Sequence, residues 1–117
     1  MSENRREFFR VNFDEFIDGE ILIEGQGSLP VKIENISAGG LVFFSSADIQ
    51  MNEKLECAFT ILESPFLIAG SIVRKSRNSS LIEYGVGFTV DQGTSSELFK
   101  ELNYYQIRLR KGTLVEE

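Results

Sequence analysis

The feature that most limits the possible folds is a series of short apolar runs that alternate with clusters of turn residues. From Gly19 onward, six runs rich in β-branched and aromatic residues are separated by Gly, Ser, Asn or Pro. Such runs predict β-strands. The predicted strands cover residues 20–24, 29–36, 40–44, 55–62, 66–75 and 81–90. Six short strands favour a closed or nearly closed antiparallel barrel, because closure hides the sheet edges.

The last part of the chain has the periodicity of a helix instead. Its predicted apolar face consists of Leu98, Leu102, Tyr105 and Leu109, at spacings of four, three and four residues. Thr94 and Glu97 fit a capping box at the start of this helix. We therefore expect an all-β fold, a six-stranded antiparallel β-barrel, with a C-terminal α-helix over about residues 94–111. Earlier in the chain, Gly85 and Gly87 suggest a bulge or bend in the sixth strand.

The composition narrows the classes of function. The 117 residues carry a net charge of −6, with a pI of about 4.7, so the surface repels nucleic acids and anionic lipids at long range. No apolar run approaches the roughly 20 residues of a membrane-spanning helix, and the first residues lack the apolar core of a secretory signal. We therefore expect a cytoplasmic protein without a membrane span.

Residues suited to catalysis are scarce. The sequence has no histidine, which removes the Ser-His-Asp and Cys-His arrangements and the usual zinc sites. The single cysteine, Cys57, lies in a strand-like alternation of apolar residues, where a buried, unreactive thiol is expected. We predict neither an enzyme nor a resident cofactor or metal.

A short basic segment stands near the start of the chain. Three of the 12 basic residues, Arg5, Arg6 and Arg10, lie within residues 5–10. Arginine presents a planar fork that pairs with phosphate oxygens, and the same fork can donate to O6 and N7 of guanine. The alternative is that these arginines only solubilise a polar tail. We expect residues 1–12 to form a flexible basic arm and residues 13–117 to form one domain.

A polar turn between the second and third predicted strands is the other candidate. The Asn35 amide can donate and accept hydrogen bonds, as reading a guanine edge requires, and the Ser37 hydroxyl suits a phosphate or the turn itself. Gly39 and Gly40 permit close backbone approach and positive φ, and they leave N–H groups for an anion. The alternative is an ordinary strand-turn-strand connection, in which these residue types are common.

Taken together, the two segments resemble the paired signature of the PilZ domain family. Arg-x-x-x-Arg occurs at residues 6 and 10, and Asn-x-Ser-x-x-Gly occurs at residues 35, 37 and 40. The order of six strands and one helix agrees with this family. Residues 84–88, Tyr-Gly-Val-Gly-Phe, are similar to its late Gly-Phe strand. The resemblance covers most of the chain, from about residue 5 to residue 111.

The resemblance implies a bacterial receptor for the second messenger cyclic di-GMP. The ligand-binding residues that it implies are Arg5, Arg6, Arg10, Asn35, Ser37, Gly39 and Gly40. In this assignment Arg6 and Arg10 hold phosphates and guanine edges, and Arg5 assists them. The family often has another contact on a later strand, for which Arg74 and Lys75 are the candidates.

The resemblance also implies a signalling mechanism. Ligand binding would draw the arginine arm over the barrel and alter a surface for a downstream effector protein of unknown identity. One alternative is a ligand-independent PilZ-like adaptor. A small barrel that binds single-stranded nucleic acid is another, although the net charge of −6 argues against it. The exposed face of the predicted helix is compatible with a monomer or a homodimer.

Overall fold

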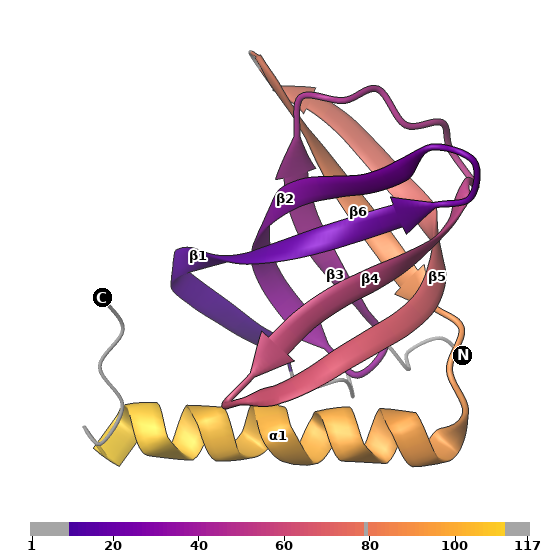
Figure 1. The fold of residues 1–117 in the computed structure, drawn as a ribbon. Helices are drawn as coiled ribbons and strands as arrows, with labels where there is room; N and C mark the ends of the chain where they lie inside the picture. Colours follow the sequence, from indigo (N-terminus) through magenta and orange to yellow (C-terminus); the bar gives the residue numbers. More distant parts are fainter. Residues whose placement is uncertain (1–9, 79, 112–117) are drawn as a thin grey trace, which may run out of the picture.

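The computed structural model describes residues 10–78 and 80–111, and it shows a barrel of six strands followed by one helix (Figure 1). The strands are β1 (Arg10–Ile23), β2 (Gly27–Ser37), β3 (Gly40–Ser45), β4 (Lys54–Ile61), β5 (Ser64–Asn78) and β6 (Leu81–Phe88); the helix is α1 (Gln92–Lys111). The predicted six-stranded antiparallel barrel with a C-terminal helix is therefore confirmed.

The barrel closes in the order β1-β2-β3-β6-β5-β4, and all neighbouring strands are antiparallel. Four of the connections join neighbours in the barrel, whereas β3 leads to β4 through a crossover. Closure depends on a short pairing, in which Glu20–Leu22 of β1 lies against Glu56–Ala58 of β4. The barrel brings β1, β2, β3, β6 and β5 into one continuous curved surface.

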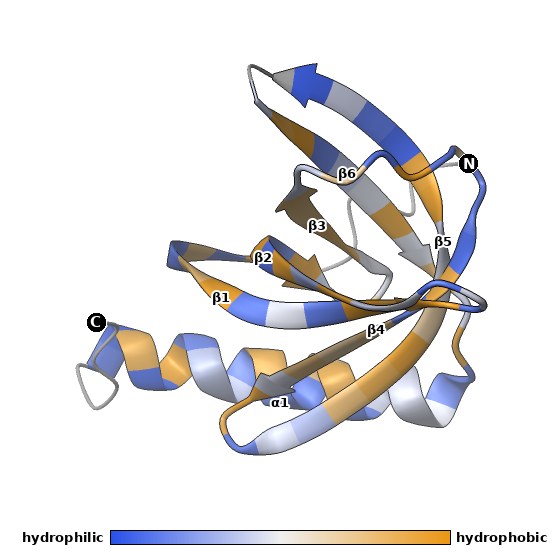
Figure 2. Cartoon of the chain, turned by 45° about the horizontal axis from the view of Figure 1, so that its top comes forward, coloured by the Kyte–Doolittle hydropathy of each residue, from blue (hydrophilic) through white to orange (hydrophobic). Residues whose placement is uncertain are grey.

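Side chains that alternate along the strands fill the interior. Hydrophobic and hydrophilic residues follow one another along β1 (Figure 2). At the centre of the core, the rings of Phe43 and Tyr84 stack with their centroids 5.0 Å apart. The Cys57 thiol is also buried, and burial raises its pKa to about 12, so it is uncharged at neutral pH. The expectation of a buried thiol is confirmed.

Helix α1 lies across the base of the barrel (Figure 1) and packs Leu98, Leu102 and Tyr105 into the core. The Tyr105 ring meets Phe13 of β1 edge to face, with 5.5 Å between centroids. These three residues belong to the predicted apolar face, and Leu109 packs against the core with partial burial. No helix in residues 10–78 and 80–111 has the length and apolar character that crossing a membrane requires.

The helix begins earlier than expected. It starts at Gln92, and the carboxylate of Asp91 accepts a hydrogen bond of 2.6 Å from the backbone N–H of Thr94. Asp91 is therefore the N-cap, and the prediction of Thr94 as the cap is wrong. An ionised carboxylate is a better cap here than the threonine hydroxyl, because it also interacts favourably with the positive end of the helix dipole.

The first strand also begins earlier than expected. Arg10–Asn12, which the sequence predicts to be part of a flexible arm, pair with Asn35–Ser37 of β2. The burial of Val11 and Phe13 explains the difference, because their apolar side chains hold this part of the chain against the core. The rest of the predicted arm, residues 1–9, lies outside the described residues.

Candidate functional site

The strand registers bring the two sequence motifs together on the outer side of the barrel. One row across the sheet consists of Arg10, Ser37, Gly40, Gly87 and Ser71. The adjacent row consists of Asn12, Asn35, Val42, Gly85 and Arg74. Between these rows, residues such as Ile36 and Val86 point into the core. Residues far apart in the sequence are thus neighbours on one surface.

A β-bulge in β2 gives the motif its outward direction. The register between β2 and β3 shifts between Ile33 and Asn35, so Glu34 is an extra residue. Because side chains alternate along a strand, an unbroken strand that buries Ile33 would also turn Asn35 and Ser37 toward the core. The bulge reverses the alternation, and both polar side chains then face the outer surface beside β1.

A second bulge, in β5, determines which basic residue joins the site. The register shifts between Ile72 and Arg74, so Val73 is the extra residue. Arg74 consequently lies on the outer surface opposite Gly85. Lys75 turns the other way, where its ammonium contacts Asp48 at 2.5 Å and lies 5.9 Å from the ring centroid of Tyr84. Of the two candidates on this strand, the structure brings Arg74 to the motif and not Lys75.

Arg10 is held at the motif by two side chains. Its Nη1 donates a hydrogen bond to Asn35 Oδ1, and its Nη2 donates one of 3.2 Å to Ser37 Oγ. The Ser37 hydroxyl also accepts a hydrogen bond of 3.1 Å from the backbone N–H of Gly39 and donates one of 3.4 Å to the carbonyl of Gly40. The guanidinium group is therefore already oriented, and three of its five N–H donors are still available.

The charge around Arg10 is positive and largely uncompensated. Partial burial lowers the pKa of Arg10, and repulsion from the nearby guanidinium of Arg74 lowers it further. Among the described residues, no carboxylate lies within ion-pairing distance of Arg10, and Arg74 reaches only Glu83, at 4.0 Å. Arginine remains charged at neutral pH despite such shifts. Two like charges that face each other in this way are suited to binding an anion.

The two arginines border a groove of about 460 Å³. It is lined by Arg10, Asn35, Leu41, Val42, Val73, Arg74, Gly85 and Val86. Gly85 gives Arg74 room, since a Cβ there would lie 3.2 Å from Arg74 Nε. A larger cavity, of about 980 Å³, opens elsewhere on the barrel, where apolar residues line it together with charged ones such as Asp18, Glu20 and Lys32. The smaller groove is the candidate site, because two motif residues, Arg10 and Asn35, line it and no described carboxylate pairs with Arg10.

The two glycines of the motif have a structural role that differs in part from the predicted one. A Cβ on Gly40 would lie only 2.1 Å from the carbonyl oxygen of Val86, so close backbone approach is confirmed at Gly40. Among the described glycines, only Gly25 and Gly27 have a positive φ, so Gly39 and Gly40 do not. The N–H of Gly39 is bonded to Ser37 Oγ and is not free for an anion. These parts of the prediction are wrong.

Two predicted site residues cannot be placed in the structure. Arg5 and Arg6 lie outside the described residues. The structure adds Val73, whose side chain is 56% exposed beside the groove.

The glycines at positions 85 and 87 predict a bulge in the sixth strand, but the bulge itself lies in the neighbouring strand β5. In the part of the chain that the structure describes, no three potential metal ligands cluster together.

Comparisons with known proteins agree with this geometry. The sequence matches the PilZ domain over residues 4–104. A search of curated protein sequences gives no significant match. The structure is similar to that of the Bacillus subtilis inhibitor of motility MotI/DgrA, with a TM-score of 0.70 and 19% identity over 89% of this chain and 52% of that one. It is also similar to YcgR from Escherichia coli in complex with c-di-GMP, with a TM-score of 0.76 and 15% identity over 93% of this chain and 49% of that one.

The chain spans about half the length of these two proteins. A separate structure, the PilZ domain of Escherichia coli YcgR with c-di-GMP, is covered over 99% of its length by 94% of this chain, with a TM-score of 0.65 and 13% identity. At such low identity these likenesses concern the fold alone. The family match, in contrast, extends over most of the sequence and includes both motifs. The chain belongs to the PilZ domain family.

Proposed function

We propose that this chain is a receptor for cyclic di-GMP, which binds in the groove between Arg10 and Arg74. The observation that carries the proposal is the Arg10 guanidinium, which Asn35 and Ser37 orient and no described carboxylate neutralises. A phosphate in the groove would relieve the repulsion between the two arginines. The family of the chain and the presence of c-di-GMP in the YcgR structures support the same ligand.

The groove residues suit the different parts of such a ligand. Arg10 and Arg74 supply forked N–H donors for phosphate oxygens or for O6 and N7 of guanine. Asn35 accepts from Arg10 through Oδ1, so its amide nitrogen has N–H donors for a ligand acceptor. Val42, Val73 and Gly85 give the groove an apolar surface on which a purine ring can lie. Binding by these groups makes and breaks no covalent bond.

The signalling step would depend on the segment before β1. Arg5 and Arg6 would complete the phosphate contacts, and residues 1–9 would settle over the barrel when the ligand binds. Because Arg10–Asn12 already pair with β2, they need not change conformation. Ordering the backbone of one flexible residue costs about 1–2 kcal/mol of free energy. The favourable free energy of the new contacts must therefore exceed the sum of these costs. The surface formed in this way would contact an effector protein.

Calorimetric titration of cyclic di-GMP tests the receptor function. We expect binding to the wild-type protein and a loss of about 10- to 100-fold in affinity for Arg10→Ala, because hydrogen bonds to charged groups are removed. Lys32→Ala is the matched control, since Lys32 is exposed, pairs with Asp18 and does not line the groove. Absence of binding to the folded wild type would contradict the proposal and would favour a ligand-independent adaptor.

A further inference from the structure

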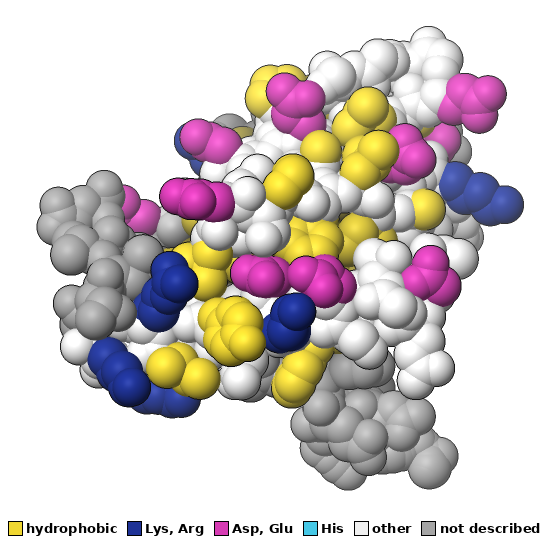
Figure 3. Space-filling model, turned by 60° about the horizontal axis from the view of Figure 1, so that its bottom comes forward, with side chains coloured by type: hydrophobic (Ala, Val, Ile, Leu, Met, Phe, Trp, Pro, Cys, Tyr) yellow, Lys and Arg dark blue, Asp and Glu magenta, His cyan; other side chains and the backbone are white. Residues whose placement is uncertain are grey.

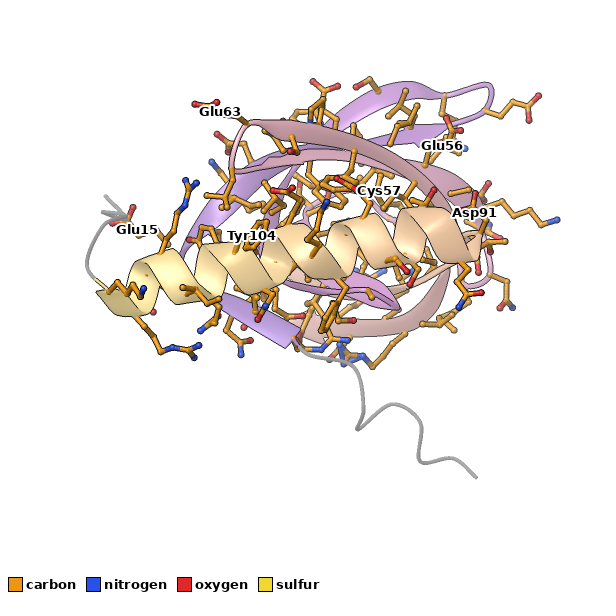
Figure 4. The ribbon with its side chains drawn as sticks, turned by 90° about the horizontal axis from the view of Figure 1, so that it is seen from below. Glu15, Glu56, Cys57, Glu63, Asp91 and Tyr104 are labelled. Carbon is orange, nitrogen blue, oxygen red and sulfur yellow. The ribbon has the colours of Figure 1, made fainter. Side chains whose placement is uncertain are left out.

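The side of α1 that faces away from the barrel carries a regular stripe of residues. At spacings of three, four, three and four, the stripe consists of Glu97, Lys100, Tyr104, Ile107 and Lys111. Residues at such spacings lie along one side of a helix. The residues of α1 that enter the core occupy other positions, so four members of this outer stripe are exposed and Ile107 is half-buried. Tyr104, near the middle of the helix, is 48% exposed (Figure 4).

The charges of the outer stripe complement those of a reversed copy of it. Tyr104 is its middle residue, Glu97 stands seven positions before it and Lys111 seven positions after it. In an antiparallel pair with its two-fold axis at Tyr104, Glu97 of each copy would therefore meet Lys111 of the other. Between these ends, the aliphatic stem of Lys100 would lie along Ile107. A parallel pair would instead place like charges opposite each other at both ends.

The other charges of α1 favour the same orientation. Its last turn carries three basic residues, Arg108, Arg110 and Lys111, whereas its two glutamates, Glu97 and Glu101, lie in its first half. On the face of the molecule that α1 forms, basic side chains gather toward the end where the helix stops (Figure 3). A helix of 20 residues is about 30 Å long, which exceeds the screening length of about 8 Å in physiological salt. Local charge at each end, and not the net charge of the chain, therefore decides how two such helices meet.

We propose that the outer stripe of α1 binds the same stripe of a second copy of this chain, in antiparallel orientation, to form a weak homodimer. The rings of the two Tyr104 residues would pack together at the two-fold axis, in the position where interfaces favour tyrosine. The dimer is weak because exposed ion pairs contribute little free energy each. None of the residues that line the groove belongs to α1, so pairing leaves the proposed ligand site open.

Sedimentation of the full chain at concentrations from about 10 µM to about 1 mM tests the pairing, because the dimer population rises with concentration. We expect the average mass to rise toward that of two copies. Tyr104→Ala should weaken self-association by about tenfold or more, since the rings at the axis are lost. Phe99→Ala is the matched control, because Phe99 is a 46% exposed ring on the same helix but outside the stripe. A wild type that stays monomeric throughout, or equal association of the two variants, would overturn the proposal.

An exchange of charges tests both the identity of the partner and its orientation. Glu97→Lys and Lys111→Glu should each abolish self-association, because like charges then meet at both ends of the pair. An equimolar mixture of the two variants should associate as the wild type does, since each new lysine meets a new glutamate and the two unchanged residues meet each other. Glu56→Lys makes the same charge change on an exposed residue of β4 and should have no such effect.

Circular dichroism of each variant shows whether α1 is retained, which separates loss of pairing from loss of the helix. If the helix is retained, a mixture that remains monomeric would overturn the antiparallel arrangement. Single variants that associate as the wild type does would place the contact elsewhere and would also overturn the proposal. The mixing result distinguishes a second copy from an unrelated partner, because the sample contains this chain alone.

Discussion

At the scale of single residues, the candidate site centres on Arg10, a cation that neutral side chains orient and that no described carboxylate neutralises. The motif position that contacts Arg10 is an asparagine, so its Oδ1 accepts a hydrogen bond but adds no negative charge. An aspartate in the same place would form an ion pair with Arg10 and would reduce the positive potential of the groove. The amide therefore leaves the charge of Arg10 uncompensated.

Arg74 gives the first prediction at this scale. Arg74→Ala should weaken the binding of cyclic di-GMP by about fivefold, because a cation at the edge of the groove is lost. Arg77→Ala is the control, since Arg77 is on the same strand but pairs with Asp48 at 3.2 Å, away from the groove. Calorimetric titration of both variants measures the difference. Equal affinities for the two variants would show that Arg74 makes no contact with the ligand.

Gly40 gives a prediction of stability. Gly40→Ala should lower the free energy of unfolding by about 3 kcal/mol or more, because the new Cβ would lie 2.1 Å from a backbone oxygen that cannot move aside. Gly93→Ala, in the first turn of α1, should be neutral or stabilising by up to about 1 kcal/mol, since the nearest atom would be 3.4 Å away. Denaturation with urea compares the variants, and a tolerated Gly40→Ala would contradict the close packing of β3 and β6.

The sequence motifs could predict that Arg10, Asn35 and Ser37 belong to one candidate site, and the structure brings them together, but Arg74 could not be chosen over Lys75. The motif residues have a fixed spacing of polar types, which the sequence displays. The choice between Arg74 and Lys75 depends on the bulge at Val73, and strand alternation alone would give the opposite answer. Hydrogen-bond saturation of Ser37 is also invisible in the sequence, because it requires the positions of three separate backbone and side-chain groups.

At the scale of the elements, the hydroxyl of Tyr84 is one of the groups that hold the loop between β3 and β4 against the barrel. The hydroxyl of Tyr84, on β6, donates to the carbonyl of Ala47 and accepts from the N–H of Ile49, each at 2.7 Å. The same loop carries Asp48, which contacts Lys75 and Arg77 of β5. These contacts connect the crossover from β3 to β4 with the strands that carry one side of the groove.

Removal of the Tyr84 hydroxyl tests this connection. Tyr84→Phe should lower the free energy of unfolding by about 1–3 kcal/mol, because a buried N–H and a carbonyl lose their partner. Tyr104→Phe, on the outer face of α1 (Figure 4), removes the same atom from a side chain that is 48% exposed, and it should change stability very little. Thermal unfolding followed by circular dichroism compares the two. Equal melting temperatures would contradict the role of the hydroxyl.

The start of α1 allows the predicted and the observed caps to be compared. Asp91 lies at this end of the helix (Figure 4), and Asp91→Ala should lower the melting temperature by about 5 °C, because the backbone N–H of Thr94 loses its acceptor. Thr94→Ala should have a smaller effect, since it removes only the side-chain hydrogen bond to the Asp91 carboxylate and leaves the backbone N–H with its acceptor. A larger loss for Thr94→Ala would support the capping box that the sequence suggested.

At the scale of the whole molecule, the order of the elements could be predicted because each strand run and the helix have their own periodicity. The true extents of β1 and α1 could not, because they depend on tertiary contacts. Val11 and Phe13 extend β1 only when a core is present to receive them. Likewise, the short pairing of β1 with β4 that closes the barrel joins strands separated in sequence, and local patterns contain no signal for its register.

The distribution of charge is also a property of the whole molecule. The chain carries a net charge of −6, yet its groove is positive. Seen from the side of α1, exposed hydrophobic side chains lie among both acidic and basic ones (Figure 3). The overall charge therefore disfavours long-range attraction of nucleic acid, whereas two local arginines can hold a small dianion at short range.

Stability and ligand affinity should depend differently on pH. The pKa of Asp48 is lowered, first by its hydrogen bond to Lys75, and that of Asp91 by its hydrogen bond to the backbone of Thr94. In the unfolded chain both carboxyl groups return to a pKa of about 4. Their contribution to stability is therefore complete above about pH 4 and is lost as the pH falls through the lowered values of the folded state. The groove keeps its charge throughout, because arginine does not titrate in this range.

We therefore expect the affinity for cyclic di-GMP to change by less than about twofold between pH 5.5 and pH 8, because the chain has no histidine to titrate there. The melting temperature should be nearly constant over the same range and should fall below about pH 4. In the Asp48→Asn/Asp91→Asn variant, the melting temperature should be lower at pH 7 and should fall less steeply with acid. Calorimetry across the pH series measures both quantities on one sample. A steep change of affinity near pH 6 would mean that a group other than these arginines controls binding, and it would contradict the electrostatic basis of the site.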